Sequence, residues 1–352
     1  MSVITILGAG VMGSSMCMPL VDQGHEVRLV GTHLDDHIID SIAGNGLHPK
    51  LNVTMPSSVK SYHHGEFANA LGNDTEIVLL GVSSAGVYWA IDRLARALKK
   101  STPIVMITKG MKPEADHMRA FPDVVTEELK TRLGFDVPVA AIAGPCIAGE
   151  LAGRRHTGTV IVSRDAALAQ TFAYAFGSSY YFPRTSADMI GVEVCAAFKN
   201  FFAIAVGWAH GRNEVLADTQ NKARNNNAAA ILFDQAVREM MALTVALGGS
   251  PTSVWGMPGV GDLYVTCQAG RNSRLGHALG RGLTYDQAKD GPLKGETVEG
   301  AELGIAVASS IRGMISTEKL KAHDVPLTLA LLDALTQNIP LEPPWADLHR
   351  SD

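Results

Sequence analysis

Near its N-terminus the chain reads Val3-Ile4-Thr5-Ile6-Leu7-Gly8-Ala9-Gly10-Val11-Met12-Gly13, and this stretch decides the fold. An apolar run rich in β-branched residues predicts a buried strand, and helical spacing of apolar residues resumes after the glycines. Gly8 allows a tight turn, Gly10 lets a diphosphate approach the backbone, and Gly13 lets the helix pack against the strand. The first N–H groups of that helix are free to bind phosphate. A strand, this glycine pattern and a helix in succession favour a dinucleotide-binding turn over an ordinary glycine-rich turn.

Further apolar strands alternate with helical patterns through the first half of the chain. We expect them at Glu26–Gly31, Glu76–Val82, Pro103–Thr108 and Val137–Ala143, with closing strands near 160–162 and 180–184. This alternation predicts an α/β fold whose parallel sheet is doubly wound, of the Rossmann type. Ligands bind such a sheet at the carboxyl ends of its strands, where Lys109 and Gly144 follow two of the predicted strands. A solvated loop residue is the alternative for Lys109.

The character of the sequence changes at about Asp188. From there helical periodicity dominates, interrupted by glycine and proline at 248–249, 258, 326 and 340. We therefore expect a dinucleotide-binding domain over residues 1–187 and an all-helical domain over residues 188–352. A chain of 352 residues is long enough for both.

The composition narrows the classes of function. With a net charge of −5, the chain has no basic excess that would favour nucleic acid or an anionic membrane surface. No uninterrupted apolar run is long enough to cross a bilayer, so we expect no membrane insertion. Four scattered cysteines without a C-x-x-C spacing favour neither a zinc site nor a disulfide framework. They suit a reducing compartment, and we expect a cytoplasmic protein with no bound metal.

The end of the second predicted strand bears on the choice of cofactor. A dinucleotide fold that prefers NAD usually carries Asp or Glu there, to hold the 2′-hydroxyl of the adenosine ribose. This chain has Thr32 and His33 at those positions, and Asp35 and Asp36 come late. Neither a clear acidic residue nor an arginine clamp is present. The sequence therefore predicts NAD or NADP without deciding between them.

A nearly wholly apolar helix, predicted over residues 193–207, contains the pair Lys199-Asn200. A buried ammonium is costly unless it is paired or used in chemistry. An ordinary lysine is protonated at neutral pH and can protonate the alkoxide that forms when a ketone is reduced. We therefore single out Lys199 as the candidate acid/base. A lysine that reaches past the helix to solvent is the alternative.

Three further stretches carry candidate site residues. Asp262 and Thr266 lie four apart and would share one face of a helix, where Asp262 would either pair with a lysine or cap the helix. Gly270-Arg271-Asn272 places a guanidinium fork beside an amide, which is a clamp for phosphate or carboxylate unless the segment is a plain exposed loop. Glu299 precedes a long helix, where it would bond a nicotinamide amide or only favour the start of that helix.

Taken together, these motifs resemble the NAD(P)-dependent glycerol-3-phosphate dehydrogenase family. The matching pieces stand in the family's order and span most of the chain: Gly8-x-Gly10-x-x-Gly13, Thr108-Lys109-Gly110, Gly144-Pro145, Glu193 to Lys199-Asn200 with Ala203 and Gly207, Gly261-Asp262-Leu263 with Thr266-Cys267, Gly270-Arg271-Asn272 and Val298-Glu299-Gly300. The resemblance implies a Rossmann-type domain, an all-helical domain like the C-terminal domain of 6-phosphogluconate dehydrogenase, and a homodimer. It also implies hydride transfer between NAD or NADP and C2 of a small phosphorylated substrate, dihydroxyacetone phosphate or glycerol 3-phosphate.

The resemblance also implies roles for individual residues. Lys199 would be the catalytic acid/base, positioned by Asp262, with Thr266 nearby and Lys109 close to both substrate and nicotinamide. The substrate would be held by Lys109, Gly144, Asp262, Gly270, Arg271 and Asn272. The cofactor would be held by Gly8, Ala9, Gly10, Val11, Met12, Gly13, Thr32, His33, Lys109, Ala148, Arg271 and Glu299.

Departures from the family's pattern gather on the substrate side. Cys146 stands where the family has a hydroxyl, Asp234-Gln235-Ala236 replaces Thr-Arg-Gly, and the loop Arg212–Asn226 is longer than usual. These departures raise a second hypothesis, a paralogous reductase of another phosphorylated ketose, polyol or sugar acid. A third hypothesis is a protein that binds the dinucleotide without catalysis. Retention of Lys109, Lys199, Asp262 and Arg271 argues against the third.

Overall fold

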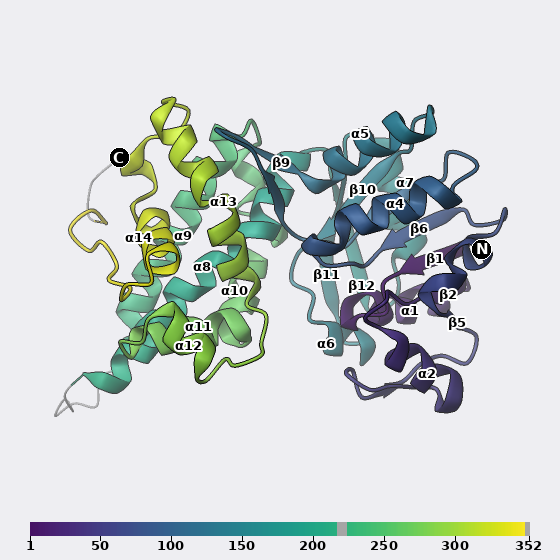
Figure 1. The fold of residues 1–352 in the computed structure, drawn as a ribbon, viewed down its shortest axis with the longest axis horizontal. Helices are drawn as coiled ribbons and strands as arrows, with labels where there is room; N and C mark the ends of the chain where they lie inside the picture. Colours follow the sequence, from purple (N-terminus) through teal and green to yellow (C-terminus); the bar gives the residue numbers. More distant parts are fainter. Residues whose placement is uncertain (217–223, 349–352) are drawn as a thin grey trace. The chain divides into compact units, whose positions relative to one another are not determined.

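The computed structural model describes residues 1–216 and 224–348, and the chain divides into two compact units (Figure 1). The first unit comprises Met1–Lys109 and Ala120–Met189, and the second comprises Gly110–Arg119 and Ile190–Asp352. The main division falls close after the boundary that we expected between residues 187 and 188. The assignment of residues 110–119 to the second unit was not expected, because so short a segment carries no periodic pattern of its own.

The first unit is built on one sheet, whose strand order is β12-β11-β10-β7-β6-β1-β2-β5 within the described residues. The strands are β1 (Val3–Leu7), β2 (Glu26–Val30), β5 (Lys60–Tyr62), β6 (Ile77–Leu80), β7 (Ile104–Met106), β10 (Val139–Ala143), β11 (Thr157–Ser163) and β12 (Tyr181–Ser186). From β5 to β10 all neighbours are parallel, and β1 pairs with both β2 and β6. The strand order reverses at β1, which is where an open sheet of this kind binds its ligand. The predicted Rossmann-type class is confirmed.

Two details of the sheet differ from the prediction. Strand β11 runs antiparallel to β10 and parallel to β12, so that edge of the sheet is mixed. The chain between β10 and β11 carries only the short helix α6 (Ala148–Ala152), and no long helical crossover returns it to the parallel direction. Strand β5 was not predicted, because Lys60-Ser61-Tyr62 is too short and too polar to give a strand pattern.

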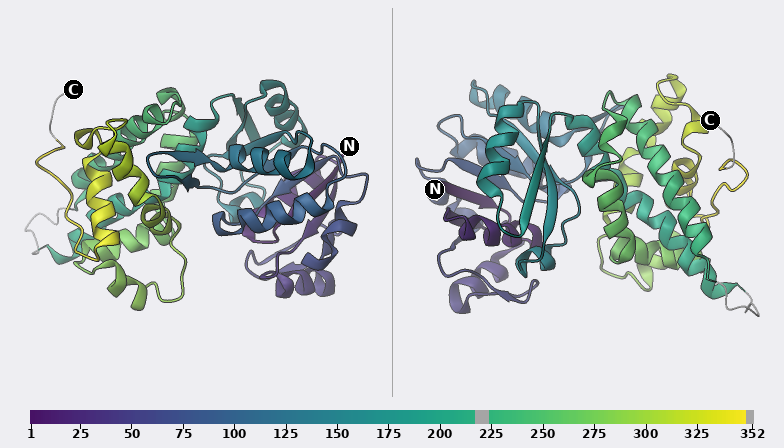
Figure 2. Two further views of the ribbon diagram at one scale, coloured as in Figure 1. Left: turned by 45° about the horizontal axis from the view of Figure 1, so that its top comes forward. Right: turned by 180° about the vertical axis from the view of Figure 1, so that it is seen from behind.

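Helices cover both faces of this sheet, as the two views of Figure 2 show. The longer ones are α1 (Val11–Asp22), α2 (Asp36–Asn45), α4 (Val87–Ala97), α5 (Phe121–Leu133) and α7 (Ala166–Phe176), and α3 (Phe67–Leu71) is short. Helix α1 packs with α6 and α7, whereas α4 packs with α3 and α5. A small hairpin, β3 (Leu47–His48) with β4 (Val53–Thr54), follows α2.

The second unit is mainly helical. Its helices are α8 (Met189–Val215), α9 (Asn226–Ala246), α10 (Asp262–Gln268), α11 (Arg271–Gly280), α12 (Tyr285–Asp290), α13 (Glu299–Ser316) and α14 (Pro326–Thr336). Over residues 188–216 and 224–348 the elements are helices, as predicted. The strands β8 (Met111–Pro113) and β9 (Met118–Ala120), which lie outside that range, pair with each other, and β8 packs on α13. Gly313 permits this approach, since a Cβ there would collide with the carbonyl of Ala115.

Helix α8 forms the core of the second unit. By length and composition this helix could cross a membrane, although Glu193 and Lys199 interrupt its apolar run, and 94% of its most apolar part is buried inside the protein. Phe198, Phe201 and Phe202 pack against one another on this helix, with ring centroids 5.4–6.4 Å apart. The apolar composition of α8 is therefore explained by its burial in the core of the second unit.

Paired glycines bring α8 and α11 into backbone contact. Gly207 and Gly211 on α8 face Ser273 and His277 on α11, while Gly276 and Gly280 on α11 face the backbone of α8. A Cβ at any of the four glycines would collide with a carbonyl of the opposite helix. The sequence therefore fixes the position of α11, and of the residues that begin it, relative to α8.

Candidate functional site

In the first unit, the glycine-rich turn between β1 and α1 has the form that a diphosphate requires. Gly8 adopts a φ of +117°, and a Cβ there would lie 2.6 Å from the carbonyl oxygen of Gly81 on the neighbouring strand's end. A Cβ at Gly13 would collide with the carbonyl of Gly8, so α1 and β1 meet only because that side chain is absent. A Cβ at Gly10 would meet nothing within 4 Å, which leaves the outer side of the turn open. This cradle fits a dinucleotide.

Both polar groups of Ala9 in this turn are held by side chains. Its N–H donates to Asp35 Oδ2 at 3.3 Å, and its carbonyl accepts from His48 Nε2 at 3.1 Å. Asp35 also accepts from Thr32, so it is turned toward the protein rather than outward. Burial lowers the pKa of His48, which favours the neutral ring seen donating to Ala9. Sequence reasoning missed His48 and gave Asp35 no role, because neither belongs to the glycine motif.

Three other predicted residues of the first unit lie at strand ends or begin a helix. Lys109 follows β7 and is half-buried, and Thr108 beside it donates to the carbonyl of Val82 at 2.8 Å, which ties the ends of β7 and β6 together. Gly144 follows β10 with a φ of +123°, and a Cβ there would press on Thr159. Ala148 begins α6. Lys109 and Gly144 are therefore at the carboxyl ends of parallel strands, as predicted.

In the second unit, Lys199 is buried on α8 with 6% of its surface exposed. Its ammonium forms an ion pair with Asp262, which is 1% exposed, and donates to Thr266 Oγ1 at 3.0 Å. The alternative in which Lys199 reaches to solvent is wrong. An ammonium taken out of water is tolerable because a carboxylate compensates its charge.

Asp262 and Thr266 share one face at the start of α10. Thr266 Oγ1 donates to the carbonyl of Asp262 at 2.6 Å, as the four-residue spacing predicts. The N-cap position is occupied by Gly261, so Asp262 serves as the partner of Lys199 rather than as the cap. A five-residue π-helical turn, Met257–Gly261, delivers Asp262, and such turns are frequent at functional sites.

A second polar cluster joins α8, α11 and α13. Asn272 Nδ2 donates to Asn200 Oδ1 at 3.1 Å, Asn200 Nδ2 donates to Glu299 Oε2 at 3.1 Å, and Gly300 N donates to Asn272 Oδ1 at 2.8 Å. Arg271 is exposed and pairs with Glu299 at 3.4 Å. Asn200, Asn272 and Glu299 thus fix the base from which the Arg271 guanidinium projects. Sequence reasoning noted Asn200 beside Lys199 but gave it no role.

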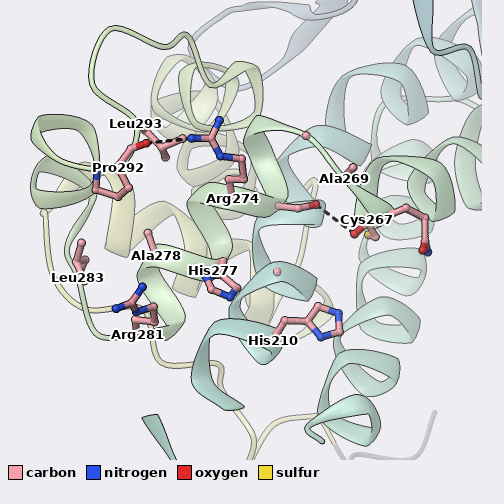
Figure 3. Close-up of a pocket in the computed structure, with 14 residues that line it drawn as sticks. His210, Cys267, Ala269, Arg274, His277, Ala278, Arg281, Leu283, Pro292 and Leu293 are labelled. Atoms are coloured by element: carbon pink, nitrogen blue, oxygen red, sulfur yellow. Dashed lines mark hydrogen bonds between the residues drawn. The ribbon is translucent and has the colours of Figure 1, made fainter. Parts of the chain in front are cut away.

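A cavity of about 610 Å³ lies beside these clusters in the second unit (Figure 3). Gly270 and Cys267 line it, together with a basic row formed by Arg274 and His277 on α11 and by Arg281 just after that helix. The residues of this row already have acidic partners, since Arg274 pairs with Glu296, and His277 and Arg281 pair with Glu214. The lining does not include Lys199, Asp262 or Thr266.

The departures from the family's pattern have partners of their own. Asp234 pairs with Arg238 at 2.8 Å, and Gln235 donates to Glu239 at 2.7 Å, so both are engaged within α9. Cys146 is half-buried against the core of the first unit. The predicted insertion Arg212–Asn226 begins in the last turn of α8 and ends at α9. Its residues 217–223, with Asp218 and Lys222, lie outside the described residues.

The thiol beside the Lys199 cluster is protonated at neutral pH. Cys267 follows Thr266 on α10, and burial raises the pKa of its thiol to about 12, with a smaller opposing effect from the charge of Lys199. Over residues 1–216 and 224–348, no group of three or more His, Cys, Asp or Glu side chains is arranged to hold a metal ion.

Two family models match this chain. The model described as the N-terminus of NAD-dependent glycerol-3-phosphate dehydrogenase matches residues 3–169, and the model of its C-terminus matches residues 188–344. The two matched ranges together span most of the chain.

Individual relatives agree with the family models. An NADP(+)-dependent glycerol-3-phosphate dehydrogenase from Archaeoglobus fulgidus is 36% identical over 290 residues, which cover 82% of this chain and 83% of the relative. A glycerol-3-phosphate dehydrogenase from Shouchella clausii, named for NAD(P)+, is 29% identical over 343 residues, or 96% and 93% of the two chains. The crystal structure of a glycerol-3-phosphate dehydrogenase from Coxiella burnetii has a TM-score of 0.78 at 26% identity and covers 99% of this chain and 97% of that one.

Proposed function

The chain belongs to the NAD-dependent glycerol-3-phosphate dehydrogenase family, and we propose that it interconverts dihydroxyacetone phosphate and glycerol 3-phosphate with NAD or NADP. The observation that carries the proposal is the buried Lys199 ammonium, held by Asp262 and Thr266. A structural role alone gives no reason to place a lysine in the core helix. A ketone reductase needs a proton donor in a desolvated place.

We assign the proton transfer to Lys199. As C2 of dihydroxyacetone phosphate is reduced, its carbonyl oxygen takes a proton from Nζ, and in the reverse direction Nζ receives the proton of the C2 hydroxyl. Asp262 compensates the charge of the ammonium, and Thr266 accepts one of its hydrogen bonds, so these two residues hold Nζ in place. Both residues act here by positioning Lys199.

The cofactor, when bound, supplies or accepts the hydride at C2. In our proposal residues 1–187 form the dinucleotide-binding domain and residues 188–352 form the substrate and dimerisation domain. The open glycine turn supports cofactor binding by residues 8–13, with the adenosine ribose near Thr32 and His33. Resemblance to the family supports contributions to the cofactor site from Lys109, Ala148, Arg271 and Glu299.

The substrate phosphate would be held by Gly270, Arg271 and Asn272. The guanidinium of Arg271 is exposed and is paired with Glu299 through Nη2 at 3.4 Å, a pair that a substrate phosphate would compete with. The N–H groups at the start of α11 are of the kind that binds anions. Lys109 and Gly144 would contact the rest of the substrate, an assignment that rests on resemblance to the family.

Resemblance to the family supports a proposal on the oligomeric state, and the cysteines support a proposal on the location in the cell. We propose a homodimer, which would be seen in sedimentation as twice the chain mass of 37.4 kDa. We propose a cytoplasmic location, supported by four cysteines that are all free thiols in the structure.

The activity is tested by NADH and NADPH oxidation over a panel of ketones. We expect dihydroxyacetone phosphate to be reduced with the highest kcat/KM. Unphosphorylated dihydroxyacetone should lose at least about 100-fold, because the contact of Arg271 with the phosphate is absent. Activity confined to a larger phosphorylated ketose would replace this proposal with the paralogous reductase. Absence of turnover on every ketone would leave a protein that only binds the dinucleotide.

A further inference from the structure

No Asp or Glu stands directly after β2 in the first unit to accept hydrogen bonds from the hydroxyls of the adenosine ribose. NAD-preferring dinucleotide folds place Asp or Glu at this point. Here the first residue after the strand is Gly31, and a Cβ there would lie 2.8 Å from Ile39 and 3.3 Å from the side chain of Asp35. The close approach of α2 therefore excludes any acid at residue 31. Residue 32 is threonine, whose hydroxyl donates to Asp35 at 2.8 Å.

The carboxylate of Asp35 is engaged in hydrogen bonds within the protein. Its Oδ2 accepts three donors, Thr32 N at 2.9 Å, Thr32 Oγ1 at 2.8 Å and Ala9 N at 3.3 Å, and the residue is only 8% exposed. This carboxylate ties the end of β2 to the glycine turn. Asp35 is thus a structural link between two loops and not a ligand for the cofactor's 2′-hydroxyl.

The acids that follow on α2 are engaged by histidines. Asp36 lies 3.2 Å from His63 and 3.4 Å from His64, and Asp40 lies 3.2 Å from His63. Hydrogen bonds from these two rings lower the pKa of Asp36, which keeps it ionised and paired. Both acids of α2 are thus paired with histidines.

Trp89 on α4 contacts two basic side chains, one of which, His33, follows the end of β2. The ring of His33 packs edge-on against Trp89 of α4, with centroids 5.7 Å apart, and the guanidinium of Arg93 lies 5.5 Å from the Trp89 centroid. Neither His33 nor Arg93 has an acidic partner within the part of the chain that the structure describes. A guanidinium without an acidic partner is suited to a phosphate monoester.

From this geometry we propose that the chain takes NADP(H) in preference to NAD(H), with His33 and Arg93 meeting the 2′-phosphate. The inference rests on the proposed function only in requiring that the glycine turn bind a dinucleotide. Thr32 and Asp35 determine specificity by exclusion, since they occupy the strand end without presenting a carboxylate to the ribose. Arg93 favours NADP(H) because its guanidinium would form an ion pair with the 2′-phosphate.

Equilibrium binding tests the preference without turnover. NADPH and NADH are titrated into the full-length protein by their fluorescence, and 2′,5′-ADP and ADP by calorimetry as probes of the adenosine end alone. We expect the 2′-phosphorylated member of each pair to bind at least about tenfold more tightly, from one charge-assisted contact. Equal or tighter binding of NADH and ADP overturns the preference while leaving the proposed function intact. If neither NADPH nor NADH binds, both proposals fail.

Matched variants distinguish the effect of the Arg93 charge on cofactor binding from the effect of its packing against Trp89. Arg93→Met should weaken NADPH and 2′,5′-ADP about tenfold and leave NADH and ADP unchanged, whereas Arg96→Met, an exposed arginine on the same helix, should change none of them. Thr32→Asp should reverse the preference toward NADH. An Arg93→Met variant that weakens all four ligands equally would show that the guanidinium only supports Trp89, and would overturn its assignment.

Discussion

Lys199 and Asp262 are buried together, and neither charge is tolerable without the other. Removing one partner of a buried pair costs about 3–5 kcal/mol, because an uncompensated charge remains. We expect Lys199→Met and Asp262→Asn each to lower the free energy of unfolding by about that amount. The double variant, which removes both charges, should recover most of the loss. Urea unfolding of the four proteins measures the coupling, and additive losses would contradict the ion pair.

For individual residues, the sequence indicated which side chains belong to the candidate site but not which of them contact one another. Lys199 was identifiable because a charged residue in an apolar helix is a local anomaly. Its pairing with Asp262 spans 63 residues, and local patterns left a helix cap as an equal alternative. Asn200 was not assigned, since its value comes from contacts with Asn272 and Glu299 that only the packed helices reveal.

At the scale of elements, the contact between α8 and α11 depends on residues that lack a side chain. We expect Gly276→Ala to lower the free energy of unfolding by about 3 kcal/mol or more, because its Cβ would collide with the Ile204 carbonyl and force the helices apart. Gly44→Ala is the matched control in α2, where a Cβ meets nothing within 4 Å and alanine should stabilise the helix by about 0.5–1 kcal/mol. Similar thermal shifts for both variants would refute the close contact.

Glu239 on α9 links that helix to the start of α14. Its carboxylate accepts hydrogen bonds from four donors: the N–H groups of Leu327 and Thr328 and the Thr328 hydroxyl, each at 2.6 Å, and the Gln235 amide at 2.7 Å. Burial nevertheless raises its pKa from the ordinary 4.5 to about 7, outweighing the lowering by these hydrogen bonds. Folding therefore favours the protonated form, so its contribution to stability is complete below about pH 4.5 and is lost as the pH rises through 7.

This pH dependence is measured against Glu239→Gln, which does not titrate. Between pH 4.5 and 8, the free energy of unfolding of the wild type relative to the variant should fall by about 3 kcal/mol, at 1.36 kcal/mol per unit of pKa shift. Denaturant titrations at a series of pH values give the difference. A difference that does not change with pH, or that rises with it, would show that the four donors hold the carboxylate ionised.

Elements were predicted best where their patterns are long. The strands β1, β2, β6, β7 and β10 and the helix α8 lie where the apolar runs indicated. Strand β5 and the hairpin at residues 110–119 were missed, because their stability comes from neighbours such as β2 and α13 and not from their own sequence. The reversal of β11 was missed as well, since strand direction depends on the path of the connection.

At the scale of the whole molecule, the chain combines a unit with a glycine turn that fits a dinucleotide and a unit that buries a lysine ammonium beside Asp262. The glycine turn could be predicted because its three glycines are local requirements of one turn. The proposed cofactor preference could not, since it rests on contacts of Asp35 with Thr32 and Ala9 that local sequence does not reveal. The proposed substrate rests on the family and on the proposed role of Arg271, which the assay with unphosphorylated dihydroxyacetone tests.

The most direct test of the account is the single-turnover reduction of dihydroxyacetone phosphate by Lys199→Met, with NADPH binding measured on the same sample. Lys130→Met, an exposed lysine of α5, is the control, and the double variant with Asp262→Asn covers the case in which the single variant does not fold. We predict wild-type NADPH affinity and a rate reduced about 10²–10⁴-fold in the Lys199 variants, with the control unchanged. A folded Lys199 variant that reduces the ketone within a few-fold of the wild-type rate would contradict the account.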